Sequence, residues 1–395
     1  MSNQTAAMAT LVSPDNLQAI FSPIEDASGM PNAAYTSQEN FEFERDNLFA
    51  KTWVAIDFVG TLKVSSVRPI DFMGYPLLIT STKQGELTVF HNVCSHRGTK
   101  LVEEERQTKG IITCPYHSWS YAHNGELKAT PHIGGVGVHK IDGFNCAKHK
   151  LREIRSHIWM GILFVNLDGN APAFEQSAEH MIRRVNHMMG KSGESLIRIP
   201  AKHGMVSMDV NCNWKLAIEN YLEAYHLPFV HPGLNSYSPL EKHLCEIYGD
   251  NSAGQLSTTF DPVMDSENPL PIFPDWNPDM MTYGDWPTLY PNLLLGFQPN
   301  HVFAMIVRPV SKNQSREDLA LFYVGDSADD PKLEAAHKKN LDDWCIVFNE
   351  DIGPCERMQI GRNSPGFQGG AFSPTLDKCS HHFHKWVGRH YQANQ

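Results

Sequence analysis

The hydrophobic pattern divides the chain into three stretches. Between residues 50 and 167, apolar and polar residues alternate in short runs, and turn-forming residues separate the runs. This spacing is typical of a small antiparallel β domain. The strands expected there are 71–81, 87–92, 110–113 and 118–122, with closing strands in 151–167. Asn124-Gly125 lies between two alternating runs and predicts a hairpin.

The other two stretches, 1–49 and 168–395, have different patterns. The first predicts a loosely held arm to about residue 32, with a short helix at 15–21, followed by a helix at 38–48. In the last stretch, helical and extended patterns mix. The helices expected are 173–190, 214–226, 331–350 and 380–391, and the extended segments are 198–213, 255–261, 289–297, 301–309 and 319–324. The predicted fold class is α+β, with a small antiparallel β domain at 50–167 and a helix-covered antiparallel sheet at 168–395.

Composition narrows the functional classes. A chain of 395 residues exceeds what one core usually fills, which supports two domains after the arm. The formal net charge of −11 argues against a nucleic-acid or anionic-membrane partner. The first residues have no signal-peptide pattern, and no segment has the apolar length of a membrane helix. Apart from Cys94 and Cys114, the cysteines are scattered, which favours free thiols in a reducing cytoplasm.

One motif in the β domain has metal-ligand spacing. It consists of a C-x-H pair and a C-x2-H pair, each beside turn-forming residues: Cys94, His96, Cys114 and His117. Two thiolates and two imidazoles form the ligand set of a Rieske [2Fe-2S] cluster, in which the histidines bind one iron. A structural zinc ion is the alternative, because Cys2His2 also suits tetrahedral coordination. Zinc motifs usually group their histidines in one half, so the spacing favours the cluster.

A second candidate metal site lies in the larger domain, within residues 213–231. If 214–226 is helical, Glu219, Glu223 and His226 fall on one face. Pro228 disturbs the helix and allows His231 to approach the same point. Two imidazoles and a carboxylate from elsewhere would form the facial triad of a non-haem Fe(II) oxygenase. In a chain with 20 histidines, ordinary surface or core histidines would explain this spacing better if the first motif were absent.

Together the two motifs resemble a known family, the catalytic α subunits of Rieske non-haem iron oxygenases. The resemblance covers nearly the whole chain after about residue 35. It rests on Cys94-x-His96-Arg97-Gly98, Cys114-Pro115-Tyr116-His117 with Trp119, Asn213-Trp214-Lys215, Glu223-x-Tyr225-His226, His231 and Glu350-Asp351.

The resemblance implies roles for individual residues. It makes His226 and His231 ligands of the mononuclear iron and Asp351 the third ligand, with Glu350 and Asp343 as rival carboxylates on the same predicted helix. Asp351 is favoured because it precedes Gly353-Pro354, where the helix is expected to end. Glu223 would bridge a cluster histidine of the neighbouring subunit to His226 for electron transfer, in a position where the family usually has aspartate.

The resemblance also implies partners and cofactors. A head-to-tail homotrimer would bring the cluster of one subunit to the iron of the next. The chain has no Gly-rich dinucleotide fingerprint, so NADH is expected to act through a separate flavin and iron-sulfur reductase. The reaction expected is hydroxylation of a small molecule by O2.

The substrate class is less well defined by the sequence. Glutamate at position 223 looks like the branch that contains choline, carnitine and glycine betaine monooxygenases. Four aromatic residues are candidates for a cage around a methylated cation: Trp276, Tyr283, Trp286 and Tyr290. Core packing is the other explanation for this cluster. Oxidation of an N-methyl group would give demethylation.

Three alternatives remain open from the sequence. The first is an aromatic acid or ring as substrate, with mono- or dihydroxylation. The second is a Rieske electron carrier with no enzymatic activity, and the third is a zinc-stabilised scaffold.

Overall fold

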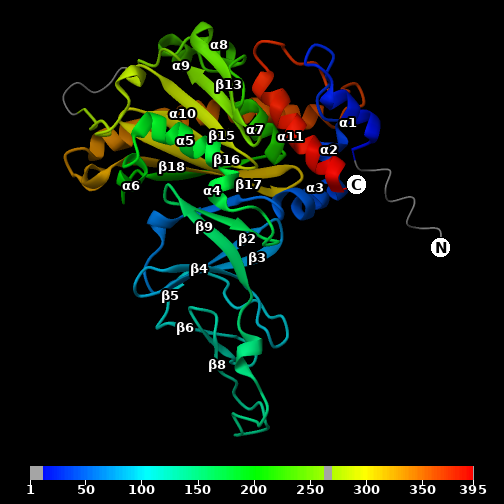
Figure 1. The fold of residues 1–395 in the computed structure, drawn as a ribbon, viewed down its shortest axis with the longest axis vertical. Helices are drawn as coiled ribbons and strands as arrows, with labels where there is room; N and C mark the ends of the chain where they lie inside the picture. Colours follow the sequence, from blue (N-terminus) through cyan, green and yellow to red (C-terminus); the bar gives the residue numbers. More distant parts are fainter. Residues whose placement is uncertain (1–11, 262–268, 395) are drawn as a thin grey trace. The chain divides into compact units, whose positions relative to one another are not determined.

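The computed structural model of the chain describes residues 12–261 and 269–394, which form two compact units (Figure 1). The smaller unit contains Ile56–Ile158 and Ile162–Asn170, and the larger unit contains the remaining described residues. Both are built on antiparallel sheets, and the larger also has helices, which confirms the α+β class. Within the described residues, no helix combines the length and the apolar character that crossing a lipid bilayer requires.

The smaller unit contains a seven-stranded sheet and a separate three-stranded sheet. The strand orders are β1-β10-β9-β4-β3-β2-β5 and β6-β7-β8. The strands are β1 (Val54–Phe58), β2 (Ser66–Phe72), β3 (Tyr75–Ser81), β4 (Leu87–His91), β5 (Arg106–Gln107), β6 (Ile111–Thr113), β7 (Ser120–Ala122), β8 (Leu127–Ala129), β9 (Glu153–Trp159) and β10 (Ile162–Asn166).

Turn residues decide where these strands begin and end. Asn124-Gly125 forms the predicted hairpin, since β7 pairs with β8 and the Gly125 N–H donates to the Ala122 carbonyl at 2.9 Å. The single strand predicted at 71–81 is wrong, because the chain reverses at Met73-Gly74 between β2 and β3. Both turn residues have positive φ, 52° and 88°, as this type of tight hairpin requires.

An eight-stranded antiparallel sheet forms the centre of the larger unit. Its order is β11-β18-β17-β16-β15-β14-β13, and β12 also pairs with β18. The strands are β11 (Ile197–Arg198), β12 (Met205–Val210), β13 (His243–Gly249), β14 (Ser252–Ser257), β15 (Gly284–Leu289), β16 (Leu293–Gln298), β17 (His301–Ser311) and β18 (Gln314–Val324). The strand predicted at 289–297 is instead the turn and second strand of the β15–β16 hairpin, since Pro291 lies at the reversal.

Helices pack against this sheet and against one another (Figure 1). The α-helices are α1 (Pro14–Phe21), α2 (Ala33–Thr36), α3 (Gln38–Glu44), α4 (Phe174–Ser177), α5 (Glu179–Met189), α6 (Gly193–Leu196), α7 (Trp214–Tyr221), α8 (Leu227–Val230), α9 (Pro232–Tyr237), α10 (Glu334–Gly361) and α11 (Lys378–Asn394). A π-helical turn, η2 (Arg45–Phe49), extends α3. Short 3-10 turns are η3 (Val59–Thr61), η4 (Cys146–His149), η5 (Leu240–Lys242), η6 (Pro278–Met280) and η7 (Gly325–Asp329).

Two helix predictions need correction. The helix predicted at 214–226 ends at Tyr221. The helix predicted to end near Gly353-Pro354 continues through Pro354 to Gly361, for 28 residues. A proline inside a helix costs about 3 kcal/mol, so this helix depends on its tertiary packing against α7 and β12.

The described part of the N-terminal arm is not loosely held. Ile20 and Met30 are fully buried, and α1 packs on α11. The Met30 N–H donates to His384 Nδ1 on α11 at 3.1 Å. Residues 1–11 of the predicted arm lie outside the described residues.

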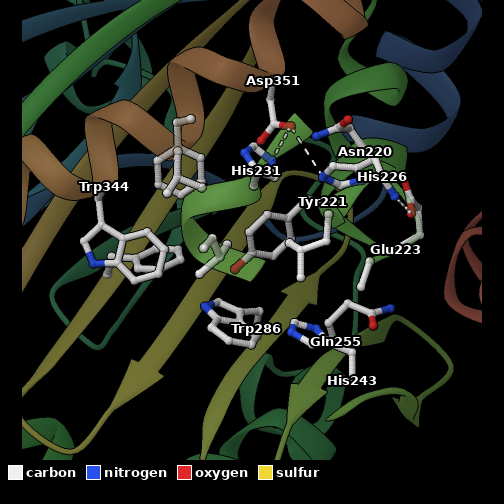
Figure 2. Close-up of a pocket in the computed structure, with 16 residues that line it drawn as sticks. Asn220, Tyr221, Glu223, His226, His231, His243, Gln255, Trp286, Trp344 and Asp351 are labelled. Carbon is white, nitrogen blue, oxygen red and sulfur yellow. Dashed lines mark hydrogen bonds and ion pairs between the residues drawn. The ribbon is translucent and has the colours of Figure 1, made fainter. Parts of the chain in front are cut away.

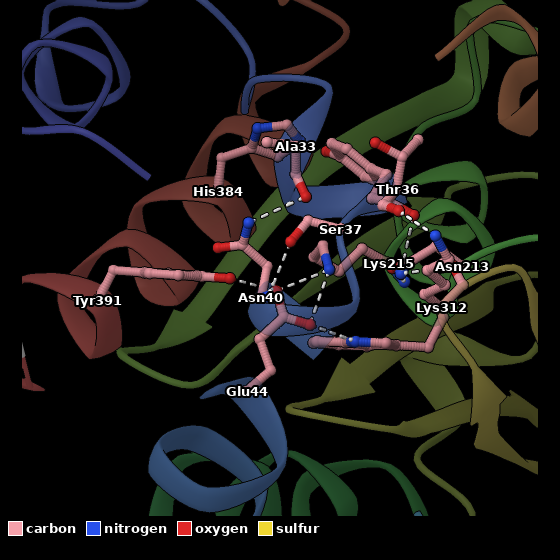
Figure 3. A network of polar contacts seen from close by, with 12 residues as sticks. Ala33, Thr36, Ser37, Asn40, Glu44, Asn213, Lys215, Lys312, His384 and Tyr391 are labelled. Carbon is pink, nitrogen blue, oxygen red and sulfur yellow. Dashed lines mark hydrogen bonds and ion pairs between the residues drawn. The ribbon is translucent and has the colours of Figure 1, made fainter. Parts of the chain in front are cut away.

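A buried ion pair joins α3 to α7 (Figure 3). Lys215 Nζ donates to both oxygens of Glu44, at 2.7 and 2.8 Å, and neither side chain has exposed area. The Trp214 indole and the Tyr391 hydroxyl also donate to Glu44, both at 2.9 Å. Asn213 caps α7 by accepting the Lys215 N–H at 3.1 Å. These bonds fix the start of α7, the helix that leads into the candidate iron site.

Removal of the Lys215 ammonium is expected to destabilise the larger unit strongly. In Lys215→Met the Glu44 carboxylate stays buried without its cation, which typically costs about 3–5 kcal/mol. The exposed Lys338, paired with Asp342 on α10, provides the control. Lys338→Met should cost about 0.5 kcal/mol or less. Urea unfolding followed by circular dichroism measures both, and similar losses for the two variants would contradict the structural role of the buried pair.

Candidate metal centres and substrate pocket

Two loops with the same pattern of backbone hydrogen bonds present the C-x-H and C-x2-H motifs in the smaller unit. In each loop, the cysteine N–H donates to the carbonyl five residues later, at 2.8 Å, and the cysteine carbonyl accepts the N–H four residues later, at 3.0 Å. The residue four positions after each cysteine has positive φ: 73° at Gly98 and 56° at Ser118. Each loop therefore presents one thiol and one imidazole in a comparable way.

The sulfur side of this arrangement is buried, whereas one of the two imidazoles is exposed. Cys94 and Cys114 are 2% exposed and belong to the hydrophobic core of the unit. His96 is exposed and His117 partly exposed; their ring centres lie 4.7 Å apart. Burial raises the pKa of the Cys94 thiol, so an iron ion would have to displace its proton. Two thiols and two imidazoles on opposed loops fit a cluster with sulfur on one iron and nitrogen on the other.

In the larger unit, Glu223 turns the chain just after α7. Its carboxylate accepts the backbone N–H groups of Tyr225 and His226, the latter at 3.1 Å. A side chain that binds nearby backbone N–H groups competes with the helix, so 222–226 form a turn. The predicted helical face of Glu219, Glu223 and His226 is therefore wrong. Glu219 instead accepts the Tyr35 hydroxyl at 2.5 Å, away from the site.

Three side chains converge beyond this turn (Figure 2). Ligand atoms of His226, His231 and Asp351 all lie within 4.8 Å of one another. Asp351 Oδ1 is 2.9 Å from His231 Nε2 and 3.5 Å from His226 Nε2. Asp351 comes from the middle of α10, and not from a helix end as predicted. Two imidazoles and one carboxylate whose ligand atoms lie this close together could hold a metal ion and leave other coordination positions open.

Carboxylates also bind the other nitrogen, Nδ1, of both imidazole rings. His226 Nδ1 donates to Glu223 at 2.6 Å, and His231 Nδ1 donates to Glu350 at 2.7 Å. Because carboxylates accept only, these bonds leave each Nε2 as the nitrogen that can bind a metal. Burial disfavours the charged His231, but Asp351 and Glu350 outweigh it and raise the pKa of His231. A metal ion would therefore compete with a proton at this site.

The rival carboxylates have other partners. Glu350 faces Nδ1 of His231 rather than the common point. Asp343 pairs with Lys339 one turn away on the same helix, and its side chain is half exposed. Among the three acidic residues considered from the sequence, the geometry therefore favours Asp351.

A pocket opens beside the three converging residues (Figure 2). Five aromatic side chains line it: Tyr221, Trp286, Phe303, Trp344 and Phe348. Of the predicted cage residues, only Trp286 lines this pocket. Trp344, Phe348 and Asp351 are spaced i, i+4 and i+7 on α10, so the helical period could have identified two of the missed residues.

The other three predicted cage residues lie elsewhere. Trp276 is buried, and its indole donates to the Met280 carbonyl at 3.2 Å. The Tyr283 N–H donates to the same carbonyl, also at 3.2 Å. Tyr290 lies in the β15–β16 turn and contacts His382 of α11 through its hydroxyl at 3.2 Å. For these residues the cage prediction is wrong, because a hairpin and a 3-10 turn separate them from the pocket wall.

Glu317 is a buried acid that the sequence gave no reason to select. It lies on β18 and lines a small cavity with Asn220, Tyr221 and Asp351, all three of which also line the aromatic pocket. Glu317 makes no side-chain hydrogen bond or ion pair with another described residue. Burial, assisted by the charge of Asp351, raises the pKa of Glu317 to about 8. Near neutral pH it is therefore largely protonated.

The fold and these sites define an oxygenase with two iron centres. The family described as Rieske [2Fe-2S] domain matches residues 52–150, and that described as ring hydroxylating alpha subunit (catalytic domain) matches residues 200–393. The chain belongs to the Rieske non-haem iron oxygenases, which confirms the resemblance found in the sequence. Proteins of this class carry a [2Fe-2S] cluster and a mononuclear iron, and they depend on a reductase for electrons.

Within that class the chain is similar to named monooxygenases. It is 25% identical to the carnitine monooxygenase oxygenase subunit of Escherichia coli (strain K12) over 355 residues, 87% of each chain. It is 24% identical to the chloroplastic choline monooxygenase of Arabidopsis thaliana over 373 residues, 92% of this chain and 82% of that protein. The fold matches that of the quaternary ammonium Rieske monooxygenase CntA in complex with L-carnitine, with a TM-score of 0.75 and 22% identity, over 94% of this chain and 98% of that one.

The raised pKa of Glu317 makes stability depend on pH. A carboxyl group that titrates near 8 when folded, and near its ordinary value when unfolded, destabilises the fold progressively as pH rises between those values. Glu317→Gln removes this effect. We expect the difference in unfolding free energy between Glu317→Gln and wild type to be about 1–3 kcal/mol more favourable to the variant at pH 8 than at pH 5. Urea unfolding after iron removal measures this difference. The exposed Glu241→Gln is the control, and an equal change at both pH values for Glu317→Gln would contradict the prediction.

Proposed function

We propose that this chain is the oxygenase component of a Rieske system whose substrate is a quaternary or tertiary ammonium compound. The observation that carries the proposal is the convergence of His226, His231 and Asp351 at the edge of an aromatic pocket. In the net reaction, one substrate C–H, O2, NADH and one proton give the alcohol, water and NAD+. Hydroxylation of an N-methyl group would release formaldehyde and the demethylated amine.

The geometry supports an assignment of residues to each iron centre. Cys94, His96, Cys114 and His117 would hold the [2Fe-2S] cluster, and His226, His231 and Asp351 would hold the mononuclear Fe(II). When bound, the two centres supply single electrons and activate O2. The chain contributes orientation, because Glu223 and Glu350 fix the two imidazoles.

The pocket supports a cationic substrate. Its aromatic rings can attract a methylated ammonium group through their faces. Two carboxylates, Glu223 and Asp351, lie at the same wall, and none of the described lining residues is lysine or arginine. The two sequence relatives are named for carnitine and choline, which are both quaternary ammonium compounds.

Exposed residues around Glu223 support electron transfer between subunits. The Glu223 side chain is 18% exposed, and the nearby Tyr225 and Phe229 are 50% and 79% exposed. Exposed aromatic rings beside a functional carboxylate are typical of a surface that a partner covers. We infer that a cluster histidine of the next subunit meets Glu223 in a head-to-tail homotrimer, with a flavin and iron-sulfur reductase as electron source in the cytoplasm.

Iron counting tests the ligand assignment. The wild-type chain should contain about three irons, two from the cluster and one mononuclear. Asp351→Ala should lower the count to about two, abolish turnover and keep the visible spectrum of the cluster. Asp343→Ala, which removes the rival acid on the same helix, should retain about three. A full iron count in Asp351→Ala, or a colourless wild-type protein, would refute the assignment.

Oxygen uptake tests the substrate class. With NADH and a Rieske reductase, we expect substrate-dependent O2 uptake with choline, carnitine or glycine betaine, and little with benzoate-type acids. Formaldehyde release would identify oxidation at N-methyl groups. Turnover of aromatic acids alone would indicate the ring-hydroxylating alternative. Absence of O2 uptake with every substrate, while the cluster is still reduced, would indicate an electron carrier.

A further inference from the structure

The hydrogen-bonding groups of the aromatic pocket are unevenly satisfied. Three of its donors are already bound to protein acceptors. The Tyr221 hydroxyl donates to the Leu295 carbonyl at 2.5 Å, and the Trp344 indole donates to His301 Nε2 at 2.8 Å. The Gln255 amide donates to the Leu222 carbonyl at 2.7 Å. The protons of these donors are therefore not available to a ligand.

His243 is the opposite case, because it has an acceptor without a donor. Its ring lines the pocket and stacks on Trp286, with an interplanar angle of 3°. Nδ1 is buried and has no hydrogen-bond partner among the described residues. Nε2 lies 3.2 Å from the Ser238 carbonyl and 2.9 Å from its hydroxyl.

The neighbouring hydroxyls fix the tautomer of His243. Ser238 Oγ donates to Ser257 Oγ at 2.9 Å, and Ser257 Oγ donates to the Thr259 carbonyl at 2.7 Å. With both hydroxyl protons used, His243 Nε2 carries the ring proton and donates to Ser238. Nδ1 is then a lone-pair acceptor, and a buried acceptor without a donor has lost the hydrogen bond that water would give it.

The pocket is also unsuited to an anion. Its described lining contains no lysine or arginine, and Glu223 and Asp351 are acidic. Burial lowers the pKa of His243 to about 4, so His243 supplies no positive charge at neutral pH. The two lining donors without a side-chain hydrogen bond to a described residue, the Asn220 amide and the Trp286 indole, are both neutral. A substrate carboxylate would be desolvated here with no lysine or arginine to pair with, and Asp351 and Glu223 would already offset the charge of a bound Fe(II).

We propose that the pocket selects an ammonium alcohol over an ammonium carboxylate, and that the substrate hydroxyl donates its hydrogen bond to His243 Nδ1. This inference rests on the proposed function and makes it more specific. It assigns His243 as a specificity-determining residue that contacts the substrate. The hydroxyl supplies the missing donor, while the aromatic walls and the carboxylates face the ammonium group.

Three matched compounds test the proposal on the iron-loaded enzyme with its reductase. Choline has the hydroxyl, ethyltrimethylammonium lacks it, and glycine betaine has a carboxylate instead. In the wild-type enzyme, kcat/KM for choline should be about tenfold or more higher than kcat/KM for ethyltrimethylammonium. It should exceed kcat/KM for glycine betaine by at least the same factor. Calorimetry should give the same order of affinities without turnover.

Variants at position 243 identify the residue responsible. His243→Phe keeps a ring on Trp286 but has no acceptor, so the preference for choline over ethyltrimethylammonium should fall to about one, mainly through KM. His243→Asn places an amide oxygen near the former Nδ1 and should restore part of the preference. His187→Phe, an exposed histidine on α5, should leave the ratio unchanged. Iron content shows that each variant is folded.

The possible failures are distinguishable. If wild-type enzyme neither binds nor oxidises any of the three compounds, the ammonium function fails, and this inference fails with it. If glycine betaine is used as well as choline, the selection against a carboxylate is overturned while the ammonium function stands. If His243→Phe keeps the full preference for choline, the role of His243 is overturned.

Discussion

Two glutamates that hold the Nδ1 atoms of two histidines set the geometry of the candidate iron site. Without Glu223 and Glu350, the rings of His226 and His231 could rotate, and either nitrogen could carry the proton. With them, both Nε2 atoms face Asp351. The same arrangement places three carboxylates around two imidazoles, and such a concentration of negative charge is best compensated by a bound cation. The pKa of His231 is raised, so in the metal-free chain a proton on His231 can supply the compensating positive charge.

The surrounding helices fix where these glutamates lie. At its start, α7 is held by the buried Glu44–Lys215 pair (Figure 3). Near its end, Glu219 accepts the Tyr35 hydroxyl and lies 3.2 Å from His384 Nε2. Polar bonds at both ends restrict rotation of α7 about its axis more than apolar packing alone would. The turn at Glu223 follows directly from the fixed end, so residues of the N-terminal segment and of α11 help to position a site that they do not contact.

A site could be predicted from the sequence when the residues that form it lie close together along the chain. The four predicted cluster ligands lie on two short loops, so their spacing in sequence was enough to indicate a cluster, and Asn124-Gly125 was enough to indicate the hairpin after it. The iron site needed α10, which lies over a hundred residues later, and its carboxylate was assigned from the family resemblance. Helix periodicity failed at 222–226 because the Glu223 side chain captures two backbone N–H groups, which a pattern of apolar residues does not register.

The aromatic cage failed for a related reason. A run rich in aromatic residues was treated as one surface, whereas the hairpin at Pro291 and the turn at Met280 direct Trp276, Tyr283 and Tyr290 away from the pocket. The aromatic wall is instead assembled from β15, β17, α7 and α10. Its residues share a surface only because the sheet and α10 pack together. Composition could indicate that rings were available, but not which of them would face a ligand.

A pocket can limit which ligands bind through the hydrogen-bonding groups that the protein itself leaves without partners. Aromatic faces accept many ammonium compounds and provide little discrimination among them. Discrimination then depends on polar groups, and most polar donors of this wall are bound to the protein itself. An unpaired acceptor penalises an empty or mismatched site, whereas the absence of lysine and arginine from the described lining penalises an anionic ligand. Both effects act through groups other than the two imidazoles of the candidate iron site, so the wall can select the molecule without disturbing the geometry that His226, His231 and Asp351 require.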